Sequence, residues 1–183
     1  MNNALYINPL WESITFMVFS NADIITNTLP KNMETSNTFP KLLVELVDIY
    51  NIREIWCITG PGPFTLMRII TLSINALTYT RNIKIKSCHF FDLIQNKNIP
   101  IIEANNGEYL IRQNDKTILI KKNELKEWSY EGIFSENLST QNIKYIQYRE
   151  NQSNIDSIFS TKNPVDRIYP IYLKPPHITC QLL

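Results

Sequence analysis

The sequence is poor in residues that enzymes commonly use for covalent or metal chemistry, with two histidines and three cysteines among its 183 residues. Cys57, Cys88 and Cys180 lie far apart and form no CxxC pair, a pattern typical of buried free thiols in a reducing compartment. Neither His89 nor His177 has a credible cysteine, serine or carboxylate partner in the sequence, so nothing supports nucleophilic catalysis. We therefore expect structural roles for both histidines, with His89 beginning a short helix or packing beside Phe90.

An excess of one charge and a long hydrophobic run are also missing. Eighteen basic and 17 acidic residues give a net charge of +1, which argues against a protein that holds a nucleic acid by itself. No apolar run approaches the roughly 18 residues that a membrane span needs. The first residues lack the basic and apolar regions of a signal peptide. We expect a cytoplasmic protein without a membrane segment.

The first part of the chain has the order of an α/β protein. The run EIWCIT over 54–59 is nearly all apolar, which is typical of a strand covered on both faces. Alternating strands and helices of this kind indicate an α/β fold. The expected strands cover 5–7, 14–19, 21–28, 54–59 and 83–88, and the expected helices cover 38–50, 63–80 and 89–95.

The second part of the chain has shorter and weaker patterns. Most of 135–163 is polar and stays unassigned, apart from strand character over 143–148 and an apolar cluster over 155–159. We place a boundary near residue 98, which gives an N-terminal lobe over 1–98 and a reduced C-terminal lobe over 99–183. Further strands are expected over 99–104, 109–112, 117–120 and 167–173, with one helical turn over 124–128.

The two long helices are apolar over most of their circumference. A helix that lies on a sheet buries one face, so these helices need a second cover. A partner chain is one candidate, and the second lobe folding over them is the other. The polar positions form one thin ridge on each helix, namely Lys41, Glu45 and Asp48 on the first and Arg68, Thr71, Asn75 and Thr78 on the second.

Two of the four glycines fall in the stretch TGPGPFTLMR, residues 59–68. No GK[ST] sequence follows, GxGxxG is absent, and Pro61 and Pro63 each remove a backbone donor, so the stretch makes a poor phosphate-binding loop. It suits a helix start, with Gly62 at the N-cap and Pro63 at the first helical position.

This stretch resembles the GPGSFTGLRIG segment of the bacterial TsaB (YeaZ) family, which takes part in threonylcarbamoyladenosine modification of tRNA. It departs from that segment at Pro63, Leu66, Met67 and Ile70. Residues 4–8 are similar to the family's opening strand, with Asn8 in place of an acid, 38–40 to the start of its first helix and 168–174 to its closing strand. The matching residues are Gly60, Pro61, Gly62, Phe64, Thr65, Arg68 and Ile69.

The resemblance implies a two-lobed actin-like and sugar-kinase-like ATPase (ribonuclease H-like) α/β fold with a reduced second lobe. It also implies a non-catalytic scaffold subunit without a cofactor or metal. Such a subunit binds a TsaD-like threonylcarbamoyl transferase, is joined by a TsaE-like ATPase, and contacts tRNA mainly through its partner. The partner-binding residues it implies on the two helices are Phe39, Leu42, Leu46, Phe64, Thr65, Met67, Arg68 and Thr71.

Two alternatives stay open. A stand-alone ATP-binding or peptidase-like relative would need an acid near the first strand to hold magnesium, and Asn8 does not supply that charge. A homodimer would use the same apolar helix pair through two-fold symmetry. With Met67 at the partner surface, we predict that Met67→Asp weakens partner binding far more than it lowers folding stability.

Overall fold

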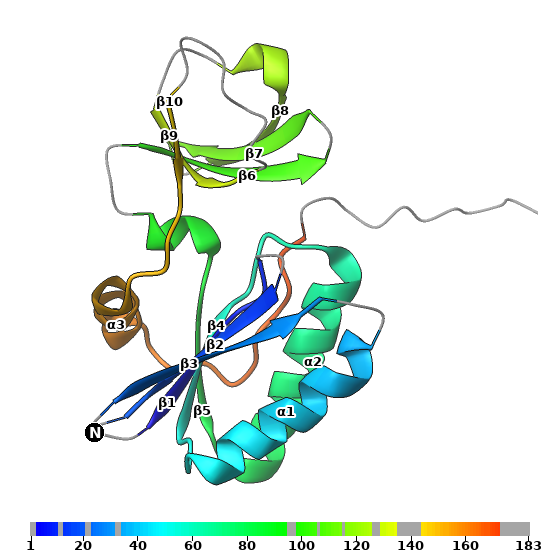
Figure 1. Ribbon diagram of the computed structural model, residues 1–183, viewed down its shortest axis with the longest axis vertical. Coiled ribbons are helices and arrows are strands. Elements are labelled where there is room, and N and C mark those ends of the chain that lie inside the picture. Colours follow the sequence, from blue (N-terminus) through cyan, green and yellow to red (C-terminus); the bar gives the residue numbers. More distant parts are fainter. Residues whose placement is uncertain are drawn as a thin grey trace, which may run out of the picture.

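The computed structural model describes residues 3–10, 13–20, 23–31, 34–94, 98–105, 107–114, 116–125, 129–134 and 144–172. Within these ranges the chain forms two five-stranded sheets, and helices cover both faces of the first. Figure 1 shows the first sheet and its helices in the lower part of the view, with the second sheet above them.

The first sheet has the strand order β3-β2-β1-β4-β5, in which β1 pairs parallel with β4, and β4 with β5. Strand β2 pairs antiparallel with both of its neighbours, β1 and β3. Every residue of β1 is buried, and so are four of the five residues of β4, as the apolar run in that segment predicts. The strands are β1 (Ala4–Asn8), β2 (Ser13–Phe19), β3 (Ile24–Pro30), β4 (Glu54–Ile58) and β5 (Lys84–Cys88).

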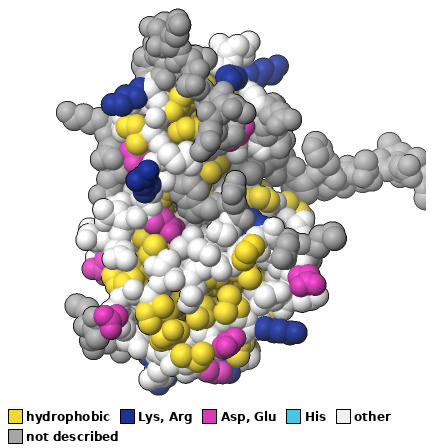
Figure 2. All heavy atoms as spheres, in the orientation of Figure 1, with side chains coloured by type: hydrophobic (Ala, Val, Ile, Leu, Met, Phe, Trp, Pro, Cys, Tyr) yellow, Lys and Arg dark blue, Asp and Glu magenta, His cyan; other side chains and the backbone are white. Residues whose placement is uncertain are grey.

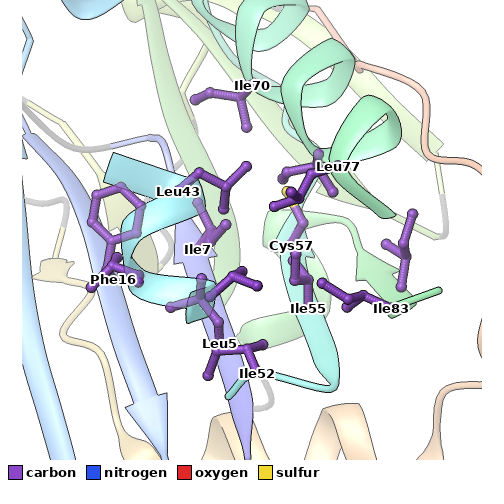
Figure 3. Close-up of a cluster of buried hydrophobic side chains, with 14 of the residues drawn as sticks. Leu5, Ile7, Phe16, Leu43, Ile52, Ile55, Cys57, Ile70, Leu77 and Ile83 are labelled. Atoms are coloured by element: carbon purple, nitrogen blue, oxygen red, sulfur yellow. The ribbon is translucent and has the colours of Figure 1, made fainter. Parts of the chain in front are cut away.

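Helices α1 (Thr35–Ile49) and α2 (Phe64–Arg81) pack side by side on one face of this sheet. Their inward side chains and those of the sheet form one apolar core, part of which Figure 3 shows around Ile7, Leu43 and Ile70. Helix α1 begins three residues before the expected position. Its first turn is already closed by the Thr38 N–H, which donates to the Glu34 carbonyl at 2.9 Å.

The opposite face is covered by the short helix η1 (Phe90–Leu93) and by α3 (Gln152–Thr161). The apolar cluster over 155–159 therefore belongs to a helix. Its Phe159 stacks on Trp56 of β4, with ring centroids 5.3 Å apart and planes nearly parallel. Asn151 caps the helix, because its side-chain oxygen accepts from the Asn154 N–H at 3.1 Å.

The second sheet has the order β10-β9-β6-β7-β8. Strand β9 has no clear apolar run, since its sequence SYEGI mixes polar and small residues, and it escapes prediction for that reason. Helix α3 follows this sheet in sequence but packs on the first sheet. The division into two lobes at residue 98 stays a prediction. The elements are β6 (Ile99–Asn105), β7 (Glu108–Gln113), β8 (Lys116–Lys121), the short helix η2 (Lys122–Glu124), β9 (Ser129–Ile133) and β10 (Lys144–Gln147).

The closing strand expected over 167–173 is wrong for the described residues 167–172. Residues 165–172, here called the C-terminal strap, run along α2 with isolated bridges instead of a ladder. Val165 donates to the Ile85 carbonyl at 2.8 Å, and Ile171 donates to the Thr59 carbonyl at 2.7 Å. Between these two points the backbone of Ile168 bonds to a side chain of α2, so no strand ladder forms there.

Candidate partner-binding surface

The glycine-rich loop before α2 is shaped by the strap that crosses it. Gly60 has φ +126°, and a Cβ there would overlap the carbonyl oxygen of Ile171. Gly62 lies against Met67, whose sulfur would be 2.6 Å from an added Cβ. Both glycines are therefore needed for close packing within the chain.

The polar groups of this loop are engaged inside the protein. The Gly62 N–H is the sole backbone donor between Pro61 and Pro63, and it donates to the Ile171 carbonyl at 3.0 Å. The Gly60 carbonyl accepts from the Phe90 N–H at 2.8 Å. A phosphate cradle needs several backbone donors that point at the ligand. In this protein the stretch instead binds the strap through backbone hydrogen bonds.

Helix α2 begins one residue later than expected. Pro63 is the N-cap, with an extended ψ of 134°, and its carbonyl accepts the first helical bond from the Met67 N–H at 3.0 Å. Phe64 is therefore the first helical residue. The expectation that Gly62 caps the helix is corrected by that one position, and the loop still stops β4 and starts α2.

Four of the eight side chains implied as partner contacts are buried inside the chain. Phe39, Leu46 and Met67 belong to its own interior, and Met67 is fully buried beneath Gly62. Thr71 is buried too, and its hydroxyl donates back to the Met67 carbonyl at 2.8 Å. Because these side chains point toward the sheet, they cannot supply contact area to a partner lying on the helices, which corrects that expectation.

The other four reach the outside to different degrees. Thr65 and Arg68 are exposed, whereas Leu42 and Phe64 are half-buried. Ile69, the last motif residue, is half-buried against the apolar core. The helical part of the motif thus contributes both exposed and half-buried residues within the first two turns of α2.

The polar ridge expected along α2 faces inward except for Arg68. Thr71 and Thr78 satisfy their hydroxyls on the carbonyls of the preceding turn, which lets these polar side chains be buried. Asn75 holds the strap with both ends of its amide: Nδ2 donates to the Ile168 carbonyl at 2.9 Å, and Oδ1 accepts from its N–H at 3.0 Å. The strap therefore covers this flank of α2.

The outward side of α2 carries large apolar side chains at positions where a surface helix is normally polar. Leu72 is 60% exposed and Tyr79 is 92% exposed, and on α1 Ile49 is 63% exposed. Figure 2 shows hydrophobic side chains gathered over these two helices. The outer stripe of α2, defined by its exposed positions spaced three or four residues apart, consists of Thr65, Arg68, Leu72, Ala76 and Tyr79.

The sequence reasoning missed Leu72, Tyr79, Val44 and Ile49 as surface residues. The signal was available in the helical period, because these side chains lie opposite those that pack on the sheet. With apolar residues around most of each helix, the pattern alone does not distinguish the apolar side that packs on the sheet from the one that stays outside. Asn75 and two threonines of the polar ridge are satisfied by backbone groups of the chain itself.

The exposed charged residues of the two helices include Lys41, Glu45 and Asp48 on α1 and Arg68 and Arg81 on α2. Arg81 pairs with Asp48 of α1 near the ends of the two helices, and both side chains are substantially exposed, so the pair contributes little to stability. Arg68 makes no ion pair with Glu45 of α1 or with any other acid among the described residues. Its guanidinium lies over the Phe64 ring, 5.8 Å from the centroid.

A second polar cluster lies at the carboxyl end of β1, where α/β proteins often bind ligands. Asn8 is fully buried, and its Nδ2 donates to Glu150 at 2.7 Å, while its Oδ1 accepts from the Leu10 N–H. The Tyr6 hydroxyl donates to the same Glu150 oxygen at 3.0 Å. Burial raises the pKa of Glu150, although hydrogen bonds from Asn8, Tyr6 and Thr15 oppose that rise.

This cluster is a poor magnesium site. The Asn8 oxygen is already used within the turn, and its amide nitrogen faces the one carboxylate. Hard cations need several free oxygen ligands. Among the described residues, no three His, Cys, Asp or Glu side chains are grouped so as to hold a metal ion.

His89 has the structural role expected of it. Its Nδ1 accepts from the Phe91 N–H at 3.1 Å, which caps η1, and its ring lies against Phe91, whereas the sequence pointed to Phe90. Burial and the nearby Arg112 lower the pKa of His89 to about 4, so it stays neutral and able to accept. Asp92 accepts from Arg112 at 2.5 Å and from Lys162 at 3.2 Å.

The described cysteines are unsuited to nucleophilic chemistry. Cys57 and Cys88 are buried and free, as expected. Burial raises the pKa of Cys88 to about 12 and that of Cys57 further, which suppresses the thiolate. Cys180 and His177 lie outside the described residues.

Comparisons with solved structures support the fold. The chain superposes on a structure described as "an uncharacterized protein with similarity to peptidase YEAZ from Pseudomonas aeruginosa", with a TM-score of 0.63, 10% identity and coverage of 95% of this chain and 100% of that one. It superposes on YeaZ from Pseudomonas aeruginosa with a TM-score of 0.53, 13% identity and coverage of 72% and 75%. No protein-family model matches the sequence, and no curated protein matches it significantly.

At these identities the likeness concerns the fold. The chain has a YeaZ-like α/β fold of two mixed sheets, which confirms the predicted fold class and, at the level of the fold, the resemblance. Within the residues that the structure describes, none of the helices combines the length and apolar character needed to cross a membrane.

Proposed function

We propose that this chain is a non-catalytic subunit of the machinery that makes threonylcarbamoyladenosine in tRNA, and that it binds a TsaD-like transferase through α1 and α2. A TsaE-like ATPase would join this pair, and tRNA contact would come mainly from the transferase. The proposal rests above all on the outer stripe of α2, which presents Leu72 and Tyr79 to solvent. The YeaZ-like fold and the GPGPFT motif support it.

An exposed apolar stripe at helical spacing fits a partner that also presents helices. Residues three and four apart on one helix pack into the grooves of another, and apolar burial supplies most of the affinity. Leu72 lies at the middle of the stripe, with Thr65 and Arg68 before it and Tyr79 after it. Central, well-buried side chains carry most of the binding energy in such interfaces.

The non-catalytic part of the proposal is supported by what occupies the two positions where this fold could do chemistry. The glycine loop before α2 seats the strap, through the bond from Gly62 to Ile171. At the end of β1, the side chain of Glu150 occupies the position, and its Oε1 already accepts hydrogen bonds from Asn8 and Tyr6. Neither arrangement favours nucleotide binding.

The test is reconstitution with the TsaD-like protein of the same organism, followed by molar-mass determination during size exclusion. We expect a one-to-one complex, and Leu72→Asp should weaken it about tenfold or more, because a charge then faces the apolar partner. Leu119→Asp is the matched control, since Leu119 is an exposed leucine of β8, 46% exposed and on the other sheet. Equal effects of the two substitutions, or no complex at all, would contradict the proposal.

Self-association is a second candidate, favoured by the symmetry of the stripe. Thr65 and Tyr79 lie seven residues before and after Leu72, and Arg68 and Ala76 lie four before and after it. An antiparallel pair of α2 helices centred on Leu72 would set Leu72 opposite its own copy, and on either side of it a large side chain opposite a small one. A two-chain mass for the protein alone, abolished by Leu72→Asp, would support this arrangement, and a monomer would exclude it.

A further inference from the structure

We propose that Arg68 selects the partner of this surface, because its guanidinium receives a carboxylate from the partner helix that lies against α2. This inference rests on the proposed function, and its occupant is the TsaD-like transferase. It specifies the chemistry that the transferase must present opposite the first half of α2, namely an acidic side chain within an otherwise apolar helix face.

Arg68 is the sole charged residue on the outer stripe of α2, between Thr65 and Leu72. Among the residues that the structure describes, no acid pairs with it. Arg81, the other cation of the helix, is already paired with Asp48. A partner that covers Leu72 must therefore also cover an arginine that the chain itself leaves without an anion.

The guanidinium is held in place by a stack of aromatic rings. Arg68 lies over Phe64 at 5.8 Å, and Phe64 in turn packs on Tyr172 of the strap, with centroids 4.5 Å apart. The strap is fixed at this point by the bond from the Gly62 N–H to the Ile171 carbonyl. A supported guanidinium loses less conformational freedom on binding, so the chain presents it ready for use.

A carboxylate is the ligand that this geometry favours. If a partner covers an arginine without supplying an anion, the guanidinium loses its hydration and gains no interaction that offsets the cost. A carboxylate offsets it by accepting two parallel hydrogen bonds from the planar guanidinium. The antiparallel self-association described above would set Arg68 opposite Ala76, and no acid lies on the stripe. The acidic partner helix is thus the feature by which a transferase is preferred over a second copy.

The experiment measures affinity for the TsaD-like protein at two or more salt concentrations, using wild type, Arg68→Met and Arg68→Lys. We expect Arg68→Met to weaken binding about 30-fold or more and to flatten the salt dependence. Arg68→Lys keeps the charge without the fork and should fall between the two. Lys116→Met, which removes an exposed cation of β8, is the control and should bind like wild type.

Thermal unfolding of each variant separates a contact role from a folding role. Arg68 is exposed, so Arg68→Met should unfold within a few degrees of wild type. Binding by Arg68→Met within about twofold of wild type, with the same salt dependence, would overturn the inference alone. Absence of binding by the wild-type protein would instead overturn the proposed function, and the assignment of Arg68 with it.

Discussion

Helices α2 and α3, on opposite faces of the first sheet, differ in the side chains that they expose to solvent. Helix α3 buries Ile155, Ile158 and Phe159 against the sheet and presents polar side chains outward, at Gln152, Ser153, Asp156, Ser157 and Ser160. Helix α2, on the other face, also buries one side but leaves Leu72 and Tyr79 outside. The same chain thus makes an ordinary amphipathic helix where no partner is proposed.

This difference indicates that the exposed apolar side chains of α2 are specific to that helix. A general excess of isoleucine and leucine would act on both helices alike. The inner side of α2 is complete without a partner, since Met67, Ile70 and Ile74 are fully buried. In the proposed function, the residues that remain outside bind the partner, and substitutions on the two sides should separate folding from binding.

The largest effect should come from a charge on the inner side of α2. Met67→Asp places a carboxylate beneath Gly62 without a polar partner, and we expect a loss of at least about 4 kcal/mol in unfolding free energy, enough to unfold many domains of this size. Leu72→Asp, on the outer side, should stay within about 0.5 kcal/mol of wild type. Urea denaturation followed by circular dichroism measures both.

This reverses the expectation drawn from the sequence, in which Met67→Asp spares the fold. A Met67→Asp protein that unfolds at the wild-type urea concentration would return Met67 to the surface. It would also remove the distinction between the inner and outer sides of the helix.

A smaller effect should follow from a methyl group in the glycine loop. Gly60→Ala combines a positive φ with overlap of the strap carbonyl, and we expect a loss of about 3 kcal/mol. Gly107→Ala is the matched control: it also has a positive φ, but nothing lies within 4 Å of the added carbon, so about 1 kcal/mol should be lost. Equal losses in thermal unfolding would show that the strap does not seat on Gly60.

The hydrogen bonds that anchor the strap should contribute a smaller amount to the free energy of unfolding. Asn75→Ala removes two hydrogen bonds to the backbone of Ile168 and leaves those groups unpaired, at a cost of about 2 kcal/mol. Thr65→Ala, on the outer stripe, should leave stability unchanged. Limited proteolysis should cut the strap faster in Asn75→Ala, and equal rates in both variants would contradict the clamp.

The elements of the first sheet were predictable because their patterns are local. A nearly continuous apolar run marks β4, and proline and glycine mark its end at Gly60. The strap was mistaken for a strand because its composition is right for one. Its hydrogen bonds go to Gly62, Thr59 and the Asn75 side chain, and these partners are distant in sequence.

Binding of a partner through α1 and α2 stays a proposal, but the exposure of the residues that the resemblance implies for it can be compared with the structure. Thr65 and Arg68 lie outside as expected, whereas Met67 and Thr71 lie inside. The direction of a helix face is decided by what the helix packs on, which a single sequence does not state. Ile70 stands where the family segment has a glycine, and its side chain packs in this chain's own core. The replacement therefore requires no matching change in a partner.

The smallest effect should be the pH dependence contributed by Glu150. Its folded-state pKa is raised by burial, so ionisation costs stability as the pH rises from the unfolded pKa through the folded pKa. Glu150→Gln removes this cost, and the variant should gain stability over wild type at neutral pH and lose that advantage in acid. Thermal unfolding from pH 4 to pH 8 measures it. An advantage that is largest in acid would contradict the assigned direction.

The most direct test of the central claim is amide hydrogen exchange with and without the TsaD-like protein. If the outer stripe of α2 is the binding surface, peptides covering Phe64–Arg81 and Thr35–Ile49 gain protection in the complex, and those covering Gln152–Thr161 do not. Protection of α3 with none on α2 would place the partner on the other face of the sheet and contradict the claim.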